Sequence, residues 1–101
     1  MREFLRGAVR LHILHHGAQG EVHGAWMATE LAKHGYRISS GSLYPTLHKM
    51  EAEGLLRSSQ EVVDGRTRRS YVATARGRRV LESTKRQLRE LARELLGDEI
   101  P

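Results

Sequence analysis

The hydrophobic positions near the start of the chain predict a helix that is buried on more than one side. Residues 2–16 contain no proline, and their apolar side chains fill most of a helical wheel. Only Arg2, Arg6 and Arg10, spaced four residues apart, form a consistently polar stripe. In so short a chain, we expect the second buried side to face another subunit. The glycine-containing run at residues 17–20 is expected to end the helix.

A second helix is predicted over residues 24–34, with Met27, Ala28 and Leu31 on one face. Trp26 does not share that face, because it lies about 200° around the helix from Ala28. It must therefore pack against something else. One interpretation is a tryptophan at the edge of the core. The other is a contact with a partner subunit or a flat apolar ligand, since tryptophan is enriched at such surfaces.

A third helix is predicted to begin at Ser39 or Ser42 and to end at Glu53. The serines are candidate N-caps. Pro45 is tolerated in the first turn of a helix, but deeper in the helix it deletes a hydrogen bond, so the pattern leaves the start open by one turn. The expected buried stripe of this helix consists of Leu43, Leu47 and Met50.

After residue 55 the apolar spacing becomes that of strands. Two apolar or β-branched runs, residues 56–63 and 68–74, flank the sequence Asp-Gly-Arg-Thr, in which Asp-Gly is a strong turn signal. We therefore predict a β-hairpin whose tip is basic.

The last segment, residues 75–96, predicts a long helix that Thr74 caps. Leucine and threonine recur there at alternating spacings of three and four, which is typical of a coiled-coil seam. The other predicted helices are shorter, so a second copy of the chain is the simplest partner. The residues expected to form this homodimer are Phe4, Leu11, Leu81, Leu88, Leu91 and Leu95.

The charge is concentrated at the predicted hairpin. The chain has 101 residues and a formal net charge of +5. Residues 57–79 contain seven arginines and two acidic residues, which gives +5, whereas residues 1–56 (six basic, five acidic) and 80–101 (four basic, five acidic) contribute +1 and −1. A solvated basic surface is the simplest interpretation, and a phosphate-binding surface is the functional one.

Composition excludes several classes of protein. At this length we expect a single small domain without a large enzyme cleft. The chain has no cysteine and therefore no disulfide framework. No apolar run approaches the roughly 18 residues of a membrane span, and the start lacks the apolar region of a signal peptide, so we expect a cytoplasmic protein with no membrane partner. No catalytic motif is supported, so we expect neither an enzyme nor a cofactor.

Three short helices followed by a basic hairpin predict a mainly α fold with a small β-hairpin, namely a winged helix-turn-helix plus a C-terminal dimerisation helix. The third helix would enter the major groove of double-stranded DNA and the wing would reach the backbone or the minor groove. An alternative is a winged-helix adaptor that binds protein or RNA without operator specificity. The residues expected to contact DNA are Ser40, Ser42, Tyr44, Thr46, His48, Lys49, Arg66, Arg68 and Arg69.

The segments SSGSLYPTLHKMEAEGLL and GRTRRSYVATARGRRVL resemble the PadR family of bacterial transcriptional regulators, as does the His-Gly pair at 23–24. Two positions depart from the family pattern: Ser40 replaces a usual proline, and residues 73–77 replace the usual Leu-Thr-Pro form. The resemblance implies a winged helix-turn-helix over residues 1–74, a dimerisation helix with a short tail over 75–101, and pairing of the last helix with the partner's first. It also implies repression that a small-molecule effector relieves, with Tyr44 on the DNA backbone. The leucine seam, which makes the chain half of a two-fold unit, predicts a palindromic operator.

The six histidines raise the question of a metal site. His12 and His16 lie four residues apart on one helical face, with His15 beside them and His23 after the turn. No cysteine is available and no carboxylate occupies a matching helical position, so we expect no metal. The histidines are expected instead to line the helix end or the dimer seam, where they would be sensitive to pH.

Overall fold

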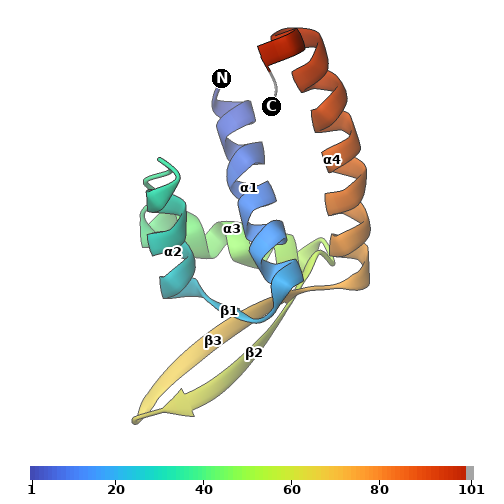
Figure 1. Cartoon of the computed structure of the whole chain (residues 1–101). Helices are drawn as coiled ribbons and strands as arrows, with labels where there is room; N and C mark the ends of the chain where they lie inside the picture. Colours follow the sequence, from blue (N-terminus) through green and yellow to red (C-terminus); the bar gives the residue numbers. More distant parts are fainter. Residues whose placement is uncertain (100–101) are drawn as a thin grey trace.

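The computed structural model describes residues 1–99, which form four helices and a small sheet (Figure 1). The end of the predicted tail, residues 100–101, lies outside the described residues. Three helices pack together, the hairpin extends away from them as a wing, and the last helix runs beside the first. In chain order the elements are α1 (Arg2–Gln19), β1 (Val22–His23), α2 (Gly24–Lys33), α3 (Ser40–Ala52), β2 (Leu56–Val63), β3 (Arg66–Ala73), α4 (Ala75–Leu96) and the 3-10 turn η1 (Gly97–Glu99).

The sheet is antiparallel, with strand order β1-β3-β2. The turn at the tip of the wing is shorter than expected. Only Asp64 and Gly65 form it, with positive φ angles of 52° and 75°, as a two-residue hairpin loop requires. Arg66 already pairs with Val63 and is part of β3. The two-residue strand β1, which pairs with Ser70 and Tyr71 of β3, was not predicted because so short a strand has no detectable period.

α1 is longer than predicted. It continues to Gln19, and Gly17 lies inside it instead of ending it. A Cβ atom on Gly17 would lie 3.2 Å from the backbone nitrogen of Ala73 in β3. The glycine at this position therefore serves the close approach of helix and strand.

α3 begins at Ser40, with Ser39 as its N-cap residue, so Pro45 lies in the second turn. Because proline has no N–H, the carbonyl of Gly41 loses its intrahelical donor. Beside this gap the hydroxyl of Thr46 donates to the carbonyl of Ser42 at 2.8 Å. The structure thus places the proline at the deeper of the two positions that the sequence left open.

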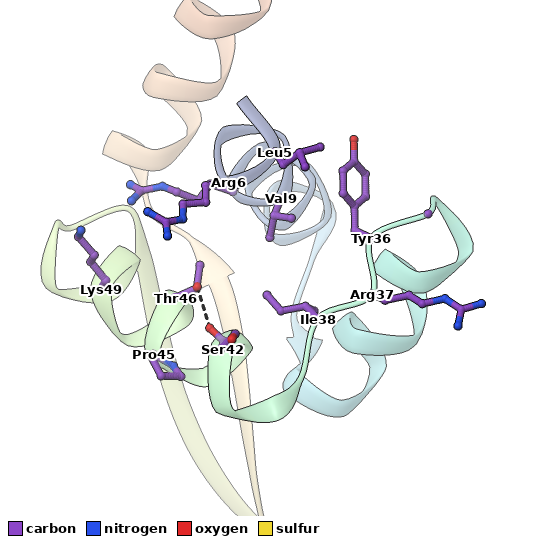
Figure 2. A pocket seen from close by; sticks show the side chains of 12 residues that line it. Leu5, Arg6, Val9, Tyr36, Arg37, Ile38, Ser42, Pro45, Thr46 and Lys49 are labelled. Carbon is purple, nitrogen blue, oxygen red and sulfur yellow. Dashed lines mark hydrogen bonds between the residues drawn. The ribbon is translucent and has the colours of Figure 1, made fainter. Parts of the chain in front are cut away.

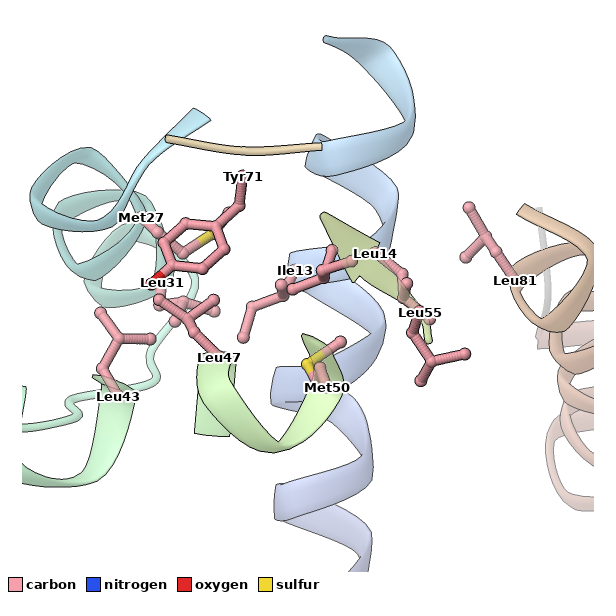
Figure 3. Close-up of a cluster of buried hydrophobic side chains, with 11 residues drawn as sticks. Ile13, Leu14, Met27, Leu31, Leu43, Leu47, Met50, Leu55, Tyr71 and Leu81 are labelled. Carbon is pink, nitrogen blue, oxygen red and sulfur yellow. The ribbon is translucent and has the colours of Figure 1, made fainter. Parts of the chain in front are cut away.

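The core lies where α1, α2 and α3 meet the base of the wing, and Figure 3 shows its central side chains. The predicted stripe of α3 is fully buried there. Tyr71 of β3 packs among these side chains, and its burial raises the pKa of its hydroxyl. The buried cluster consists of Ile13, Leu14, Met27, Leu31, Leu43, Leu47, Met50, Leu55, Leu56, Tyr71 and Leu81.

α4 has the predicted bounds and the predicted cap, since the Thr74 hydroxyl accepts a hydrogen bond from the Gly77 amide at 3.0 Å. Leu81 is buried against the core, whereas Leu88, Leu91 and Leu95 are 46%, 44% and 70% exposed. Most of the apolar seam of α4 is therefore uncovered in a single chain. No helix within residues 1–99 combines the length and apolarity that a membrane crossing requires.

Candidate nucleic-acid interface

The exposed face of α3 is narrow and built largely from small or compact residues. With Leu43, Leu47 and Met50 in the core, the helical period places Gly41, Pro45, His48 and Lys49 on the opposite side. Ser40 is exposed in the first turn. Gly41 in the first turn and Pro45 in the second have little side chain to block an approaching surface, as a recognition helix requires.

Tyr44 lies at one edge of this face and packs against the beginning of α2. A Cβ atom on Gly24 would lie 2.7 Å from Cε1 of the Tyr44 ring and 3.0 Å from its hydroxyl oxygen. The glycine therefore leaves the space in which the ring rests. The ring is 37% exposed, so it is positioned by packing while remaining at the surface.

A hollow of about 610 Å³ joins Tyr44 to the wing. Three arginines, Arg66, Arg68 and Arg69, line it together with the first residues of α2. Asp64 at the turn is the one acidic residue among the lining side chains. Guanidinium groups bind phosphate bidentately, and a helix N-terminus also favours an anion, so this hollow is suited to a nucleic-acid backbone.

The three wing arginines do not have equivalent surroundings. Arg66 is exposed, and Arg68 is exposed with its guanidinium 3.4 Å from Nε2 of His23. Arg69 is half-buried and donates to the hydroxyl of Ser58 at 3.4 Å. Adjacent strand residues point to opposite faces, which separates Arg69 from the other two. Arg69 therefore also has a role within the fold.

Glu51 of α3 anchors β2 next to Arg69. Its carboxylate accepts hydrogen bonds from the backbone N–H of Ser58 at 3.1 Å and from the Ser58 hydroxyl at 2.6 Å. These hydrogen bonds, with Arg69 nearby, lower the pKa of the Glu51 carboxyl. No local pattern predicts this contact, which holds β2 of the wing against α3.

A second hollow, of about 750 Å³, lies between α1 and the other edge of α3 (Figure 2). Ser42, Thr46 and Lys49 face it, and Thr46 is half-buried with its hydroxyl proton donated to Ser42. Arg6 of α1 adds positive charge here, whereas Arg37 of the α2–α3 connection lies at the rim with its guanidinium group directed outward (Figure 2). These two arginines were missed because their proximity arises from tertiary packing.

The residues predicted for dimerisation gather in one groove between α1 and α4. This groove has a volume of about 580 Å³ and is mainly apolar. Phe4, 53% exposed, lies on its α1 side, and Leu95 extends the same stripe of α4 toward the C-terminus. The seam residues in its lining are Phe4, Leu11, Leu81, Leu88 and Leu91.

Trp26 lies apart from this groove. Its ring is 43% exposed and meets the ring of His16 edge-on, with centroids 5.2 Å apart. It lines a shallow hollow of about 360 Å³ together with residues of the α1–α2 connection.

Three of the six histidines come together. Ligand nitrogens of His12, His16 and His34 all lie within 4.8 Å of one another. α1 has no carboxylate near these rings, but α2 places one there. Oε1 of Glu30 lies 3.9 Å from Nε2 of His16 and 3.5 Å from Nε2 of His34. The three histidines are the group in the described part of the chain whose ligand atoms lie this close together, and Glu30 lies beside two of them.

Comparisons with known proteins agree with this fold. Residues 13–83 match the transcriptional regulator PadR-like family. The chain is 66% identical over 97 residues to the transcriptional regulator Rv3488 of Mycobacterium tuberculosis, covering 96% of this chain and 91% of that protein. A crystal structure of a PadR-like regulator from Bacillus cereus superposes with a TM-score of 0.84 at 30% identity, covering 98% of each chain. A PadR-family regulator from Eggerthella lenta gives 0.82 at 29% identity, covering 92% of this chain and 82% of that one.

Proposed function

The chain belongs to the PadR-like family of transcriptional regulators, and from this we propose that it acts as a dimeric, sequence-specific DNA-binding repressor. The observation that carries the proposal is the continuous surface formed by the exposed face of α3, Tyr44 and the wing arginines. In this proposal residues 1–74 form the DNA-binding unit and residues 75–101 the dimerisation helix with its tail.

The surface divides into groups that would position the protein and groups that would read sequence. His48 and Lys49, beside the compact residues of α3, have side chains that reach base edges in the major groove. The hydroxyl groups of Ser40 and Tyr44, at the start and edge of the helix, suit phosphate contacts. The exposed guanidinium groups of Arg66 and Arg68 would hold the backbone or enter the minor groove.

The dimer proposal rests on the groove between α1 and α4. Its apolar lining is continuous with the exposed leucines of α4, and a contiguous apolar surface of this kind is typical of a protein–protein contact. A second copy fits because a two-fold interface uses the same patch on both chains. α4 of one chain would then cover the exposed side of α1 in its partner.

A two-fold dimer presents two recognition helices, so its operator would be a palindrome with half-sites about one helical turn apart. Such a complex represses by occupying a promoter, and a small-molecule effector would relieve repression by changing the distance between the two recognition helices. Trp26, exposed beside a shallow hollow, is the candidate contact for such a ligand or for a partner chain.

The decisive test of this function is a comparison of duplexes. A protein with this function binds a duplex from its own promoter at least about 10³-fold more tightly than a random duplex at the same salt concentration. Equal affinity for both would instead favour the adaptor, and preference for RNA would identify an RNA-binding module.

A further inference from the structure

We propose that His12, His16, His34 and Glu30 form a binding site for a divalent ion of the zinc class, and that the bound ion regulates DNA binding. The site would hold one ion per chain with three imidazole nitrogens and one carboxylate oxygen. The regulation of DNA binding by the ion rests on the proposed function, whereas the binding of the ion does not.

The donor set matches the chemistry of zinc. Zinc is bound by imidazole nitrogens at 2.0–2.1 Å and by carboxylate oxygens at similar distances, in tetrahedral geometry. Such an ion places its ligand atoms about 3.3 Å apart, as those bond lengths require. The nitrogens here lie within 4.8 Å of one another, so small side-chain rotations would close the site. With imidazole and carboxylate donors and no thiolate, the site favours Zn²⁺ over Cu⁺.

Glu30 is already oriented for this role. Its Oε2 atom lies 3.6 Å from the Lys33 ammonium group, while Oε1 faces the histidines His16 and His34. The lysine therefore engages one oxygen and leaves the other directed into the cluster. The carboxylate is half-buried, so its negative charge is only partly screened by water.

The imidazole rings are held by aromatic packing. The His12 ring lies 4.9 Å from that of His34 and 5.0 Å from that of Tyr36, centroid to centroid. The His16 ring packs edge-on against Trp26. Rings held in this way lose less freedom when an ion binds.

The position of the cluster connects the two functional surfaces. His12 follows Leu11 on α1 and lines the apolar groove itself, whereas His34 caps the end of α2. Five residues after His34, Ser39 caps α3. An ion that draws the four donors together would fix α1, on the dimer side, relative to the segment that leads into the recognition helix. A small movement there changes the angle between two recognition helices.

The first experiment measures zinc binding to the full chain purified without a histidine tag. Calorimetry and native mass spectrometry are expected to show one Zn²⁺ per chain, and Co²⁺ should give the visible absorption of a tetrahedral complex that zinc abolishes. His34→Gln and Glu30→Gln should each weaken zinc binding by at least about 10-fold, because losing a direct ligand costs no less than losing an outer-shell partner, which typically costs about 10–100-fold. No stoichiometric zinc in the wild-type protein would overturn the site.

His15→Gln is the matched control, since His15 neighbours His16 but lies outside the triad. It should retain wild-type zinc affinity. Circular dichroism of each variant without metal confirms folding, which is expected because His34 is exposed and Glu30→Gln replaces the half-buried carboxylate by an amide of nearly the same size. If the control lost zinc as strongly as His34→Gln, or if His34→Gln and Glu30→Gln bound zinc like the wild type, the ligand assignment would be wrong.

The second experiment titrates promoter duplex with and without zinc. Zinc should change the apparent affinity of the wild-type protein for the duplex by at least about 5-fold and should leave that of Glu30→Gln unchanged. Because coupling between two sites is reciprocal, the duplex should change the zinc affinity of the wild type by the same factor. Stoichiometric zinc without this change would overturn the regulation of DNA binding alone. Failure to bind the promoter duplex in either condition would overturn the proposed function and, with it, that regulation, while the zinc measurements would still decide the metal site.

Discussion

At the scale of single residues, the candidate interface depends on how each polar side chain is held. Tyr44 rests on Gly24, whereas Arg69 is engaged by Ser58 and Arg68 reaches the edge of the wing near His23. The sequence indicated all three residue types but not these differences. Burial and partners distinguish a side chain that is free to bind from one that also supports the fold.

Tyr44→Phe tests the proposed phosphate contact. The ring should still pack on Gly24, so the free energy of unfolding should remain unchanged, while loss of the hydroxyl should weaken DNA binding by about 1 kcal/mol, or roughly 5-fold. Titration of promoter duplex measures the change. An affinity equal to the wild type would remove Tyr44 from the interface.

Arg68→Ala and Arg69→Ala should separate binding from folding. Arg68→Ala is expected to weaken binding to every duplex and to flatten the slope of log affinity against log salt by about one unit, with little effect on stability. Arg69→Ala should also destabilise the protein, because this residue is half-buried and bonded to Ser58. An unchanged salt slope in Arg68→Ala would place the wing off the DNA.

At the scale of elements, the sequence predicted those features that repeat along the chain. The stripe of α3, the bounds of α4 and the Thr74 cap follow from periodicity and capping, and the structure confirms them. The unpredicted features depend on a single close approach. Gly17 continues α1 where the helix packs closely against Ala73, and Val22 forms β1 by pairing with Tyr71. Local pattern contains no information about such contacts.

The contact between α3 and β2 through Glu51 gives a pH-dependent prediction. Because the pKa of Glu51 is lowered in the folded protein, its stabilising effect is present above the unfolded-state value near 4.5 and is lost as pH falls through the folded value. Glu51→Gln should therefore cost about 1–2 kcal/mol near neutral pH and progressively less in acid. Urea unfolding at several pH values measures this, and a pH-independent difference would contradict the role of the charge.

At the scale of the whole molecule, distant segments meet to form the candidate sites. Arg6 and Arg37 join Lys49 beside α3, and Glu30 and His34 of α2 join the histidines of α1. The proximity of Glu30 to His16 cannot be predicted from helical spacing, because the two residues belong to different helices. The apolar groove between α1 and α4 likewise requires both ends of the chain.

Leu88→Glu combined with Leu91→Glu tests the proposed assembly. Two carboxylates in the seam would be buried in a dimer, so sedimentation should show a monomer and operator binding should fall sharply. Ser83→Glu with Arg86→Glu is the matched control, because both positions are exposed on another side of α4, and it should remain a dimer. A seam variant that still sediments as a dimer would place the interface elsewhere.

We propose that this chain recognises a specific DNA sequence as a two-fold dimer. The most direct measurement is selection of bound duplexes from a random pool, followed by the affinity and stoichiometry of the selected sequence. We predict enrichment of a palindrome that binds two chains at least about 10³-fold more tightly than random duplex. A pool without any enriched sequence, or equal affinity for selected and random duplexes, would contradict it.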